Sequence, residues 1–157
     1  MRNQFALQVS PNMQYLAAKL SRIGNSSFPG HARYDQTCNA ILGFTVTAIP
    51  SESGQRPGLY LPNKETIPID QMGEGVPNVV EFLADLALSD GKLFIVEEPE
   101  NDIHPKALKA LLDLIVESSK SNQFVVSTHS NIVLRHLGAI EGSRVYNVTA
   151  LPGSLPT

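Results

Sequence analysis

Two adjacent glutamates, Glu97 and Glu98, directly follow a wholly apolar run at residues 93–96. Such a run is typical of a strand buried on both faces of a parallel sheet. Open α/β sheets bind ligands at the carboxyl ends of their strands, so consecutive acids there can have separate tasks. One carboxylate can face a hydrated Mg²⁺ ion, and the other can face a water that attacks a phosphate. The alternative is that both acids begin a solvated turn, and the pair alone favours neither interpretation.

A histidine, His129, follows a second strand-like segment at residues 123–127, whose apolar run is 124–126. An imidazole at a strand end can donate a hydrogen bond to a phosphate oxygen, although a histidine with a purely structural role is the commoner case. The stretch between Glu98 and His129 is long enough for one helix and one strand. The spacing therefore places both strand ends side by side, and predicts that the two polar ends form one site.

Two glycines, Gly73 and Gly75, stand directly before a run with helical spacing, in the sequence Gln71-Met72-Gly73-Glu74-Gly75. Glycines at a helix N-terminus allow backbone N–H groups to approach a phosphate closely. An ordinary glycine turn would look the same, so these glycines indicate a phosphate site only in combination with the glutamate pair and the histidine.

The elements that position these residues follow from apolar spacing. Helices are predicted at residues 13–20, 77–89, 105–119 and 131–137. Strands are predicted at 44–49, 58–61, 66–69, 93–96, 123–127 and 144–148. Residues 24–30 have loop composition, and 51–58 that of a hairpin turn. Pro68 predicts a sheet edge, and Asp102 is expected to cap the helix whose first turn contains Pro105.

Helices and strands alternate from residue 73 onwards, which predicts an α/β fold with a parallel sheet flanked by helices. A small β-hairpin element precedes it near the N-terminus. We expect three parts: a helical and β-hairpin segment at 1–70, the α/β lobe at 71–150, and a tail at 151–157.

Composition limits the class of protein. The chain has 157 residues, 42% of them hydrophobic, which is enough for a core and excludes global disorder. Only 17% are charged, so part of the surface is expected to be covered by a partner. The formal net charge of -3 does not indicate a nucleic-acid binder. A single cysteine, Cys38, is expected to be buried and predicts a reducing, cytoplasmic setting, and no apolar run is long enough to suggest a membrane partner.

The three motifs together, at residues 71–75, 93–105 and 127–130, resemble in order and spacing the carboxyl-terminal half of an ABC-type ATPase head. The resemblance is to bacterial AAA-type ATPases related to the overcoming-lysogenization-defect (OLD) nucleases and to SMC and RecF proteins. It covers about residues 71–137 and implies a P-loop NTPase fold. In that family the glycine element is the signature motif and the acid pair is Walker B. The Glu-Asn-x-x-His-Pro stretch is the D-loop, and Thr-His-Ser contains the switch histidine.

The resemblance implies a role for each residue. Glu97 would help to hold Mg²⁺ through water, Glu98 would polarise the attacking water, and His129 would contact the γ-phosphate of ATP. Gly73 and Gly75 would present backbone amides to a nucleotide held by another subunit.

Other motif residues would face the second subunit. Asn101, Asp102 and His104 would lie at the dimer interface, between the two active sites. Gln71 replaces the signature serine common in transporters, which changes that phosphate contact. Glu97 replaces the commoner first aspartate of Walker B.

The sequence contains no Walker A motif. The only Gly-Lys pair is Gly91-Lys92, with Leu86 in place of the first glycine and Leu93 in place of Ser or Thr. Most phosphate contacts would therefore be missing. We expect a truncated or split head, inactive in isolation, whose partner is a Walker A lobe or a second ATPase subunit in a head-to-tail dimer.

The resulting hypothesis is part of an ATP-binding and ATP-hydrolysing machine, with ATP and Mg²⁺ as cofactors, that closes as a dimer to drive work on DNA or a partner. One alternative is a regulatory or interaction subunit that has lost Walker A. Another is the ATPase portion of an OLD-type nuclease defence protein, although no Asp-x-Asp follows His129.

Overall fold

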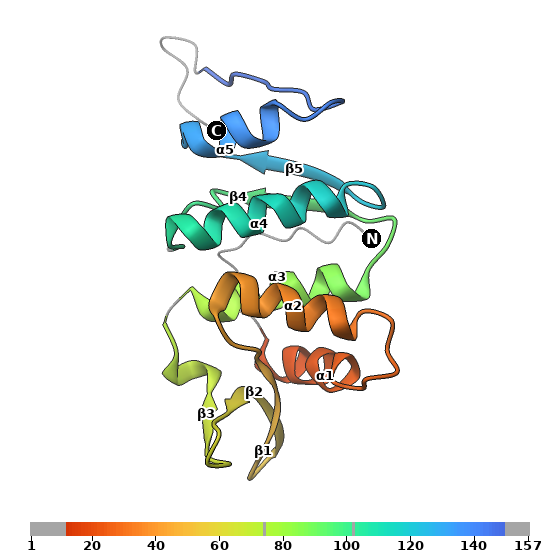
Figure 1. Cartoon of the computed structure of the whole chain (residues 1–157), viewed down its shortest axis with the longest axis vertical. Coiled ribbons are helices and arrows are strands. Elements are labelled where there is room, and N and C mark those ends of the chain that lie inside the picture. The colour runs from red at the N-terminus through yellow and green to blue at the C-terminus, as the bar shows by residue number, and fades with distance from the viewer. Residues whose placement is uncertain (1–11, 74, 102, 150–157) are drawn as a thin grey trace.

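The structure, a computed structural model, describes residues 12–73, 75–101 and 103–149 (Figure 1). The helices are α1 Met13–Ile23, α2 His31–Leu42, η1 Ile69–Gln71 (a 3-10 helix), α3 Val76–Leu88, α4 Pro105–Ser118 and α5 Asn131–Gly138. The strands are β1 Thr47–Ser51, β2 Gly54–Tyr60, β3 Thr66–Pro68, β4 Leu93–Glu97 and β5 Gln123–Ser127. None of the helices within these ranges is long and apolar enough to cross a membrane.

The three-stranded sheet is antiparallel, in the order β1-β2-β3, and lies at one end of the molecule (Figure 1). Ser51 pairs with Gly54, so only two residues form the turn between β1 and β2. The expected turn at residues 51–58 is thus too long, because the polar first half of β2 is exposed and shows no apolar alternation. The edge predicted from Pro68 is confirmed, since β3 pairs on one side only.

Helix α2 was not predicted. Its buried residues Tyr34, Cys38 and Ile41 have helical spacing, but polar residues lie between them and the helix is only weakly amphipathic. The hydroxyl of Tyr34 donates to the Val46 carbonyl oxygen at 2.8 Å and ties α2 to the chain before β1. Cys38 is buried, as expected, and burial raises the pKa of its thiol to about 11, so the thiol is protonated and acts as a packing group.

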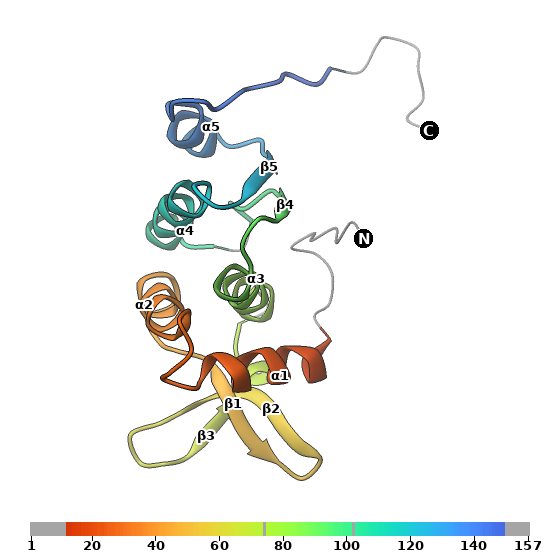
Figure 2. The same cartoon turned by 90° about the vertical axis from the view of Figure 1, so that its right-hand side faces the viewer.

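The α/β fold is confirmed in the second half of the chain, where β4 and β5 pair in parallel with Leu93 opposite Gln123 and Glu97 opposite Ser127. Phe94 is fully buried, stacks on Phe124 at 5.3 Å between ring centroids, and meets the Phe82 ring of α3 edge-on at 5.9 Å. Helices α4 and α5 cover the same side of this pair of strands (Figure 2).

The prediction that β4 is buried on both faces is wrong. Leu93 on β4 and Val125 on β5 are 47% and 56% exposed, whereas Phe94 and Val96 lie in the helical core. Among the described residues, helices therefore pack on one face of the β4–β5 pair, and the other face is only partly covered (Figure 2).

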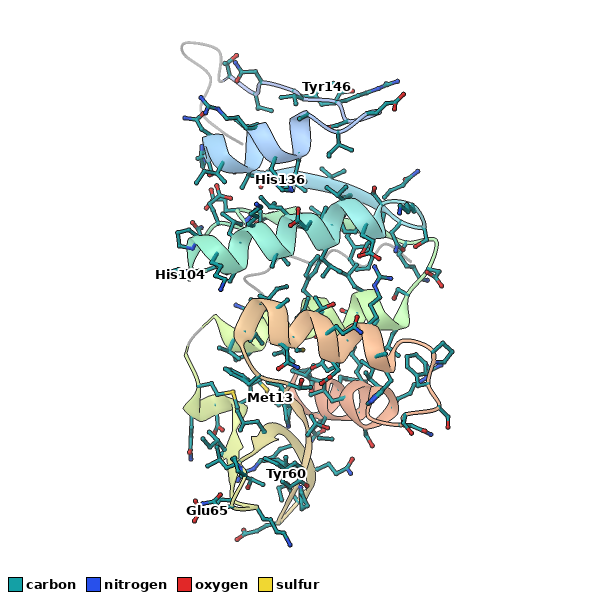
Figure 3. The ribbon with its side chains drawn as sticks, in the orientation of Figure 1. Met13, Tyr60, Glu65, His104, His136 and Tyr146 are labelled. Atoms are coloured by element: carbon teal, nitrogen blue, oxygen red, sulfur yellow. The ribbon has the colours of Figure 1, made fainter. Side chains whose placement is uncertain are left out.

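The end of the described chain also departs from expectation. No strand forms at residues 144–148, where Val145, Tyr146 and Val148 are 63%, 77% and 92% exposed (Figure 3). Alternating apolar residues indicate a strand only if a neighbouring strand supplies hydrogen bonds, and β5 does not pair with this segment. The predicted tail at 151–157 lies outside the described residues.

Candidate active site

Glu98 is the first residue beyond β4, and its backbone is unusual. Its amide donates to the Ser127 carbonyl oxygen at 2.9 Å, which extends the parallel ladder by one bond. Its φ of +45° then places it in the left-handed region, which non-glycine residues seldom adopt. Backbone strain of this kind costs about 1–3 kcal/mol, and residues that bear it cluster at functional sites.

A tight turn follows, from Glu98 to Asn101. The Asn101 amide donates to the Glu98 carbonyl oxygen at 2.9 Å, and Pro99, at the second position, is buried. The Asn101 side chain also donates, from Nδ2 to Glu98 Oε2 at 2.6 Å. Asn101, expected at a dimer interface, therefore holds one oxygen of Glu98 within its own chain.

The other oxygen of Glu98 faces the predicted switch histidine. His129 Nε2 lies 3.3 Å from Glu98 Oε1, and the two side chains are 90% and 38% exposed, respectively. The parallel pairing of β4 and β5 thus brings together the two residues that the spacing placed side by side. An imidazole next to a carboxylate, both open to solvent, can take part in proton transfer or bind an oxyanion.

Glu100 is a site residue that the sequence reasoning missed. Its Oε1 accepts three hydrogen bonds from the loop after β5: from Thr128 Oγ1 at 2.6 Å, the His129 amide at 3.0 Å and the Ser130 amide at 3.1 Å. Burial by itself would raise the pKa of Glu100, but these donors outweigh it and the pKa is lowered. No sequence signal distinguishes this acid from a solvated turn residue, because its partners are about 30 positions away.

Glu97, the expected metal ligand, is exposed at the end of β4. Within the described ranges its carboxylate has no hydrogen-bond or ion-pair partner, and no cluster of three or more acidic, histidine or cysteine residues could hold a metal by itself. This donor set fits Mg²⁺, which is commonly bound by one or two carboxylates, several waters and the substrate phosphates.

The glycine element lies before α3. Gln71 ends η1, Gly75 is the N-cap of α3, and no side chain caps this helix. A Cβ at Gly73 would meet only Val76 Cγ2, at 4.0 Å, so packing does not require glycine there. Glu74 lies outside the described residues. The element is on the same side of the molecule as the carboxyl end of β5 (Figure 1), but no hydrogen bond in the described ranges joins it to Glu98 or His129.

Helix α4 begins at Pro105, as predicted, but with a different capping residue. Its N-cap is His104, whose Nδ1 accepts from the Lys106 amide at 3.3 Å (Figure 3). The expected cap Asp102 lies outside the described residues. His104 is exposed, so it is free to meet a partner, as the interface hypothesis requires.

Comparison with known proteins identifies the class. Residues 17–135 match the protein family described as "AAA domain, putative AbiEii toxin, Type IV TA system". This match covers more than half of the chain, so the chain belongs to that family of AAA domains. It is therefore an ATPase-type domain of the P-loop class, whose members generally bind ATP with Mg²⁺.

Solved structures add a more distant likeness. Among 13 matching chains is the SMC head domain from Thermotoga maritima, with a TM-score of 0.44 and 16% sequence identity. The match covers 76% of this chain and 44% of that one, so this chain spans less than half the length of that head domain. No curated protein matches the sequence.

Proposed function

We propose that this chain supplies the hydrolytic residues of an ABC-type AAA ATPase, with Glu98 as general base and His129 as the γ-phosphate contact. The observation that supports this most is the 3.3 Å approach of His129 Nε2 to Glu98 Oε1 at the carboxyl ends of two parallel strands. Two titratable groups that face each other at this edge of the sheet form a site for polarising a water next to a phosphate.

The turn prepares Glu98 for this role. Asn101 donates to Oε2, so Oε1, which lies 3.3 Å from His129 Nε2, is the oxygen that can accept a proton from water, and 38% exposure of the side chain gives water access. His129 is open to solvent and can donate from Nε2 to a phosphate oxygen when a nucleotide is present. A general base of this kind contributes about 10²- to 10⁴-fold to the rate.

Glu97 is the proposed Mg²⁺ ligand, acting through water from the end of β4. Mg²⁺ neutralises phosphate charge when bound. Glu97 ends β4, whereas Glu98 lies in the left-handed turn that follows and faces His129, so the two carboxylates can act separately. Lack of other partners for Glu97 in the described ranges is consistent with this role.

The sequence has no Walker A motif, so we propose that a second lobe or subunit supplies it in a head-to-tail arrangement. Gly73 and Gly75, with Gln71 in place of serine, would offer backbone amides to the nucleotide of the partner. Open space around Gly73 supports this, because the fold does not otherwise need a glycine there. The partner would resemble those of OLD-type and SMC-type ATPases, and the work would be done on DNA or on a bound protein.

The second candidate is a regulatory subunit that offers the glycine element in trans and does not hydrolyse ATP with its own residues. The missing Walker A motif favours it. The two candidates differ in whether Glu98 is needed for turnover, and a single substitution separates them.

The test uses an assembly of this chain with a lobe that contains Walker A. Glu98→Gln should lower the turnover of ATP by about 10²- to 10⁴-fold and leave nucleotide binding intact, because it keeps the shape and removes the base. Glu52→Gln is the matched control, since Glu52 lies exposed in the β1–β2 turn, and β1 and β2 lie at one end of the molecule, away from β4 and β5 (Figure 1). The chain alone should show no turnover. Turnover by the Glu98→Gln assembly at the parent rate would exclude Glu98 as the base and favour the regulatory subunit.

A further inference from the structure

The carboxylate of Glu100 connects the two loops that form the site. It follows β4 in the turn that contains Glu98, and all its donors lie in the loop after β5. Thr128 Oγ1 donates to Glu100 Oε1 and itself accepts from the Ser130 amide at 2.9 Å. The loop at 128–130 is therefore folded around a single oxygen atom.

The imidazole of His129 needs such a support. Its side chain is 90% exposed, so almost nothing packs against the ring, and its position is set by the backbone that carries it. That backbone is fixed at the His129 amide by Glu100. Glu98 and Glu100 belong to the same tight turn, which is closed by hydrogen bonds from Asn101 to Glu98. A shift of this turn would therefore move the Glu98 carboxylate and the Glu100 carboxylate together.

Capping of α5 does not explain these contacts. Ser130 is already the N-cap of that helix, and its Oγ accepts from the Ile132 amide at 3.2 Å. Glu100 bonds only to residues that precede the first turn of α5. Its second oxygen, Oε2, is buried without a hydrogen-bond partner among the described residues. A buried oxygen without a partner is unfavourable, so the placement of Glu100 is not one that stability alone would select.

We propose that Glu100 is a positioning residue, which holds the loop at residues 128–130 so that the His129 imidazole lies at the Glu98 carboxylate. The inference rests on the proposed function for its catalytic meaning, although the contact itself can be tested without ATP. It assigns a role to an acid that the Walker B pair does not include.

The first experiment is NMR of the full chain. Replacing Glu100 by glutamine keeps the shape but loses the charge, and charge-assisted hydrogen bonds are about twice as strong as neutral ones. Hydrogen exchange at the His129 and Ser130 amides should therefore become about tenfold faster in Glu100→Gln, and faster still in Glu100→Ala. The nuclear Overhauser contact between the His129 ring and the Glu98 side chain should weaken in both variants. Glu52→Gln should change none of these signals.

A merely structural role predicts a different pattern. Loss of amide protection throughout α5, and not only at residues 129 and 130, would show that Glu100 supports the helix and would overturn the proposal. Unchanged exchange and an unchanged His129–Glu98 contact in Glu100→Ala would overturn it as well.

The second experiment is turnover in the assembly that contains Walker A. Glu100→Gln should lower kcat with little change in KM for ATP, because the loop orients His129 and does not bind the nucleotide by itself. An unchanged kcat alongside the loosened loop would overturn the positioning role. If the parent assembly shows no turnover while the NMR changes occur as expected, the proposed function fails but the contact stands, so the two failures are distinguishable.

Discussion

The left-handed backbone of Glu98 leads to a stability prediction that can be made without any nucleotide. At φ = +45°, a side chain with a Cβ costs about 1–2 kcal/mol relative to its preferred region, and glycine does not bear this cost. Glycine also loses more conformational entropy on folding, by about 0.5–1 kcal/mol relative to alanine. Glu98→Gly should therefore be more stable than Glu98→Ala by about 0.5–1 kcal/mol, the reverse of the order in a helix or strand.

The comparison of Glu98→Gly with Glu98→Ala isolates the free-energy cost of the left-handed backbone at this position. Both lose the bond from Asn101 Nδ2 and the contact with His129, so these losses cancel in the difference. The assay is urea unfolding with a common m-value, and in a domain of this size the difference corresponds to about 1–4 °C in Tm. Lys64 provides a matched control, because its φ is +69° and it lies exposed in the turn after β2. Lys64→Gly should likewise be more stable than Lys64→Ala.

The refuting result is specific. If glycine is the more stable residue at position 64 but alanine is at least as stable as glycine at position 98, then Glu98 is not in the left-handed region. The described conformation of the turn at residues 98–101, which brings the Glu98 carboxylate to His129, would then be incorrect.

Two further predictions concern charged groups. Lys19 Nζ lies 2.7 Å from Oδ1 of the buried Asp85. Lys19→Met should lower the free energy of unfolding, measured by urea titration, by about 3 kcal/mol, because it leaves a buried carboxylate without this partner. A loss no larger than that caused by Lys109→Met, a control at an exposed lysine, would contradict this prediction. The pKa of Glu100 is lowered in the folded state, so its stabilising contribution is complete above the ordinary value of 4.5 and is lost as the pH falls through the lower folded value. The difference in free energy of unfolding between the parent chain and Glu100→Gln should accordingly be constant from pH 7 to pH 5 and shrink below about pH 4.5. A difference that persists to pH 2 would show that the pKa of Glu100 is not lowered by its hydrogen bonds in the folded state.

The sequence predicted best those elements whose apolar pattern matches their burial. Helices α1, α3, α4 and α5 and strands β4 and β5 lie within a few residues of their predicted bounds, because each presents a regular apolar face to the core. Helix α2 was missed because its apolar residues form only a weak stripe along the helix. The predicted strand at 144–148 was wrong because pairing depends on a neighbour that the local sequence does not reveal.

The candidate site likewise contains features that the sequence could predict and features that it could not. Adjacency of Glu98 and His129 could be predicted, because parallel strands bring their carboxyl ends to one edge. Glu100 could not, since a side chain that hydrogen-bonds to backbone amides some 30 residues away leaves no pattern in the sequence. The left-handed backbone of Glu98 also has no signal in the residue type, because glutamate seldom adopts it.

A double-mutant cycle on Glu98 and His129 tests the central claim most directly. Turnover is measured in the assembly that contains Walker A, for Glu98→Gln, His129→Ala and the variant that carries both changes. Residues that act as one catalytic unit are strongly non-additive, so the double variant should be hardly slower than the Glu98→Gln variant. If the two losses instead multiply, the residues act independently, and the contact at 3.3 Å is not the hydrolytic pair proposed for this chain.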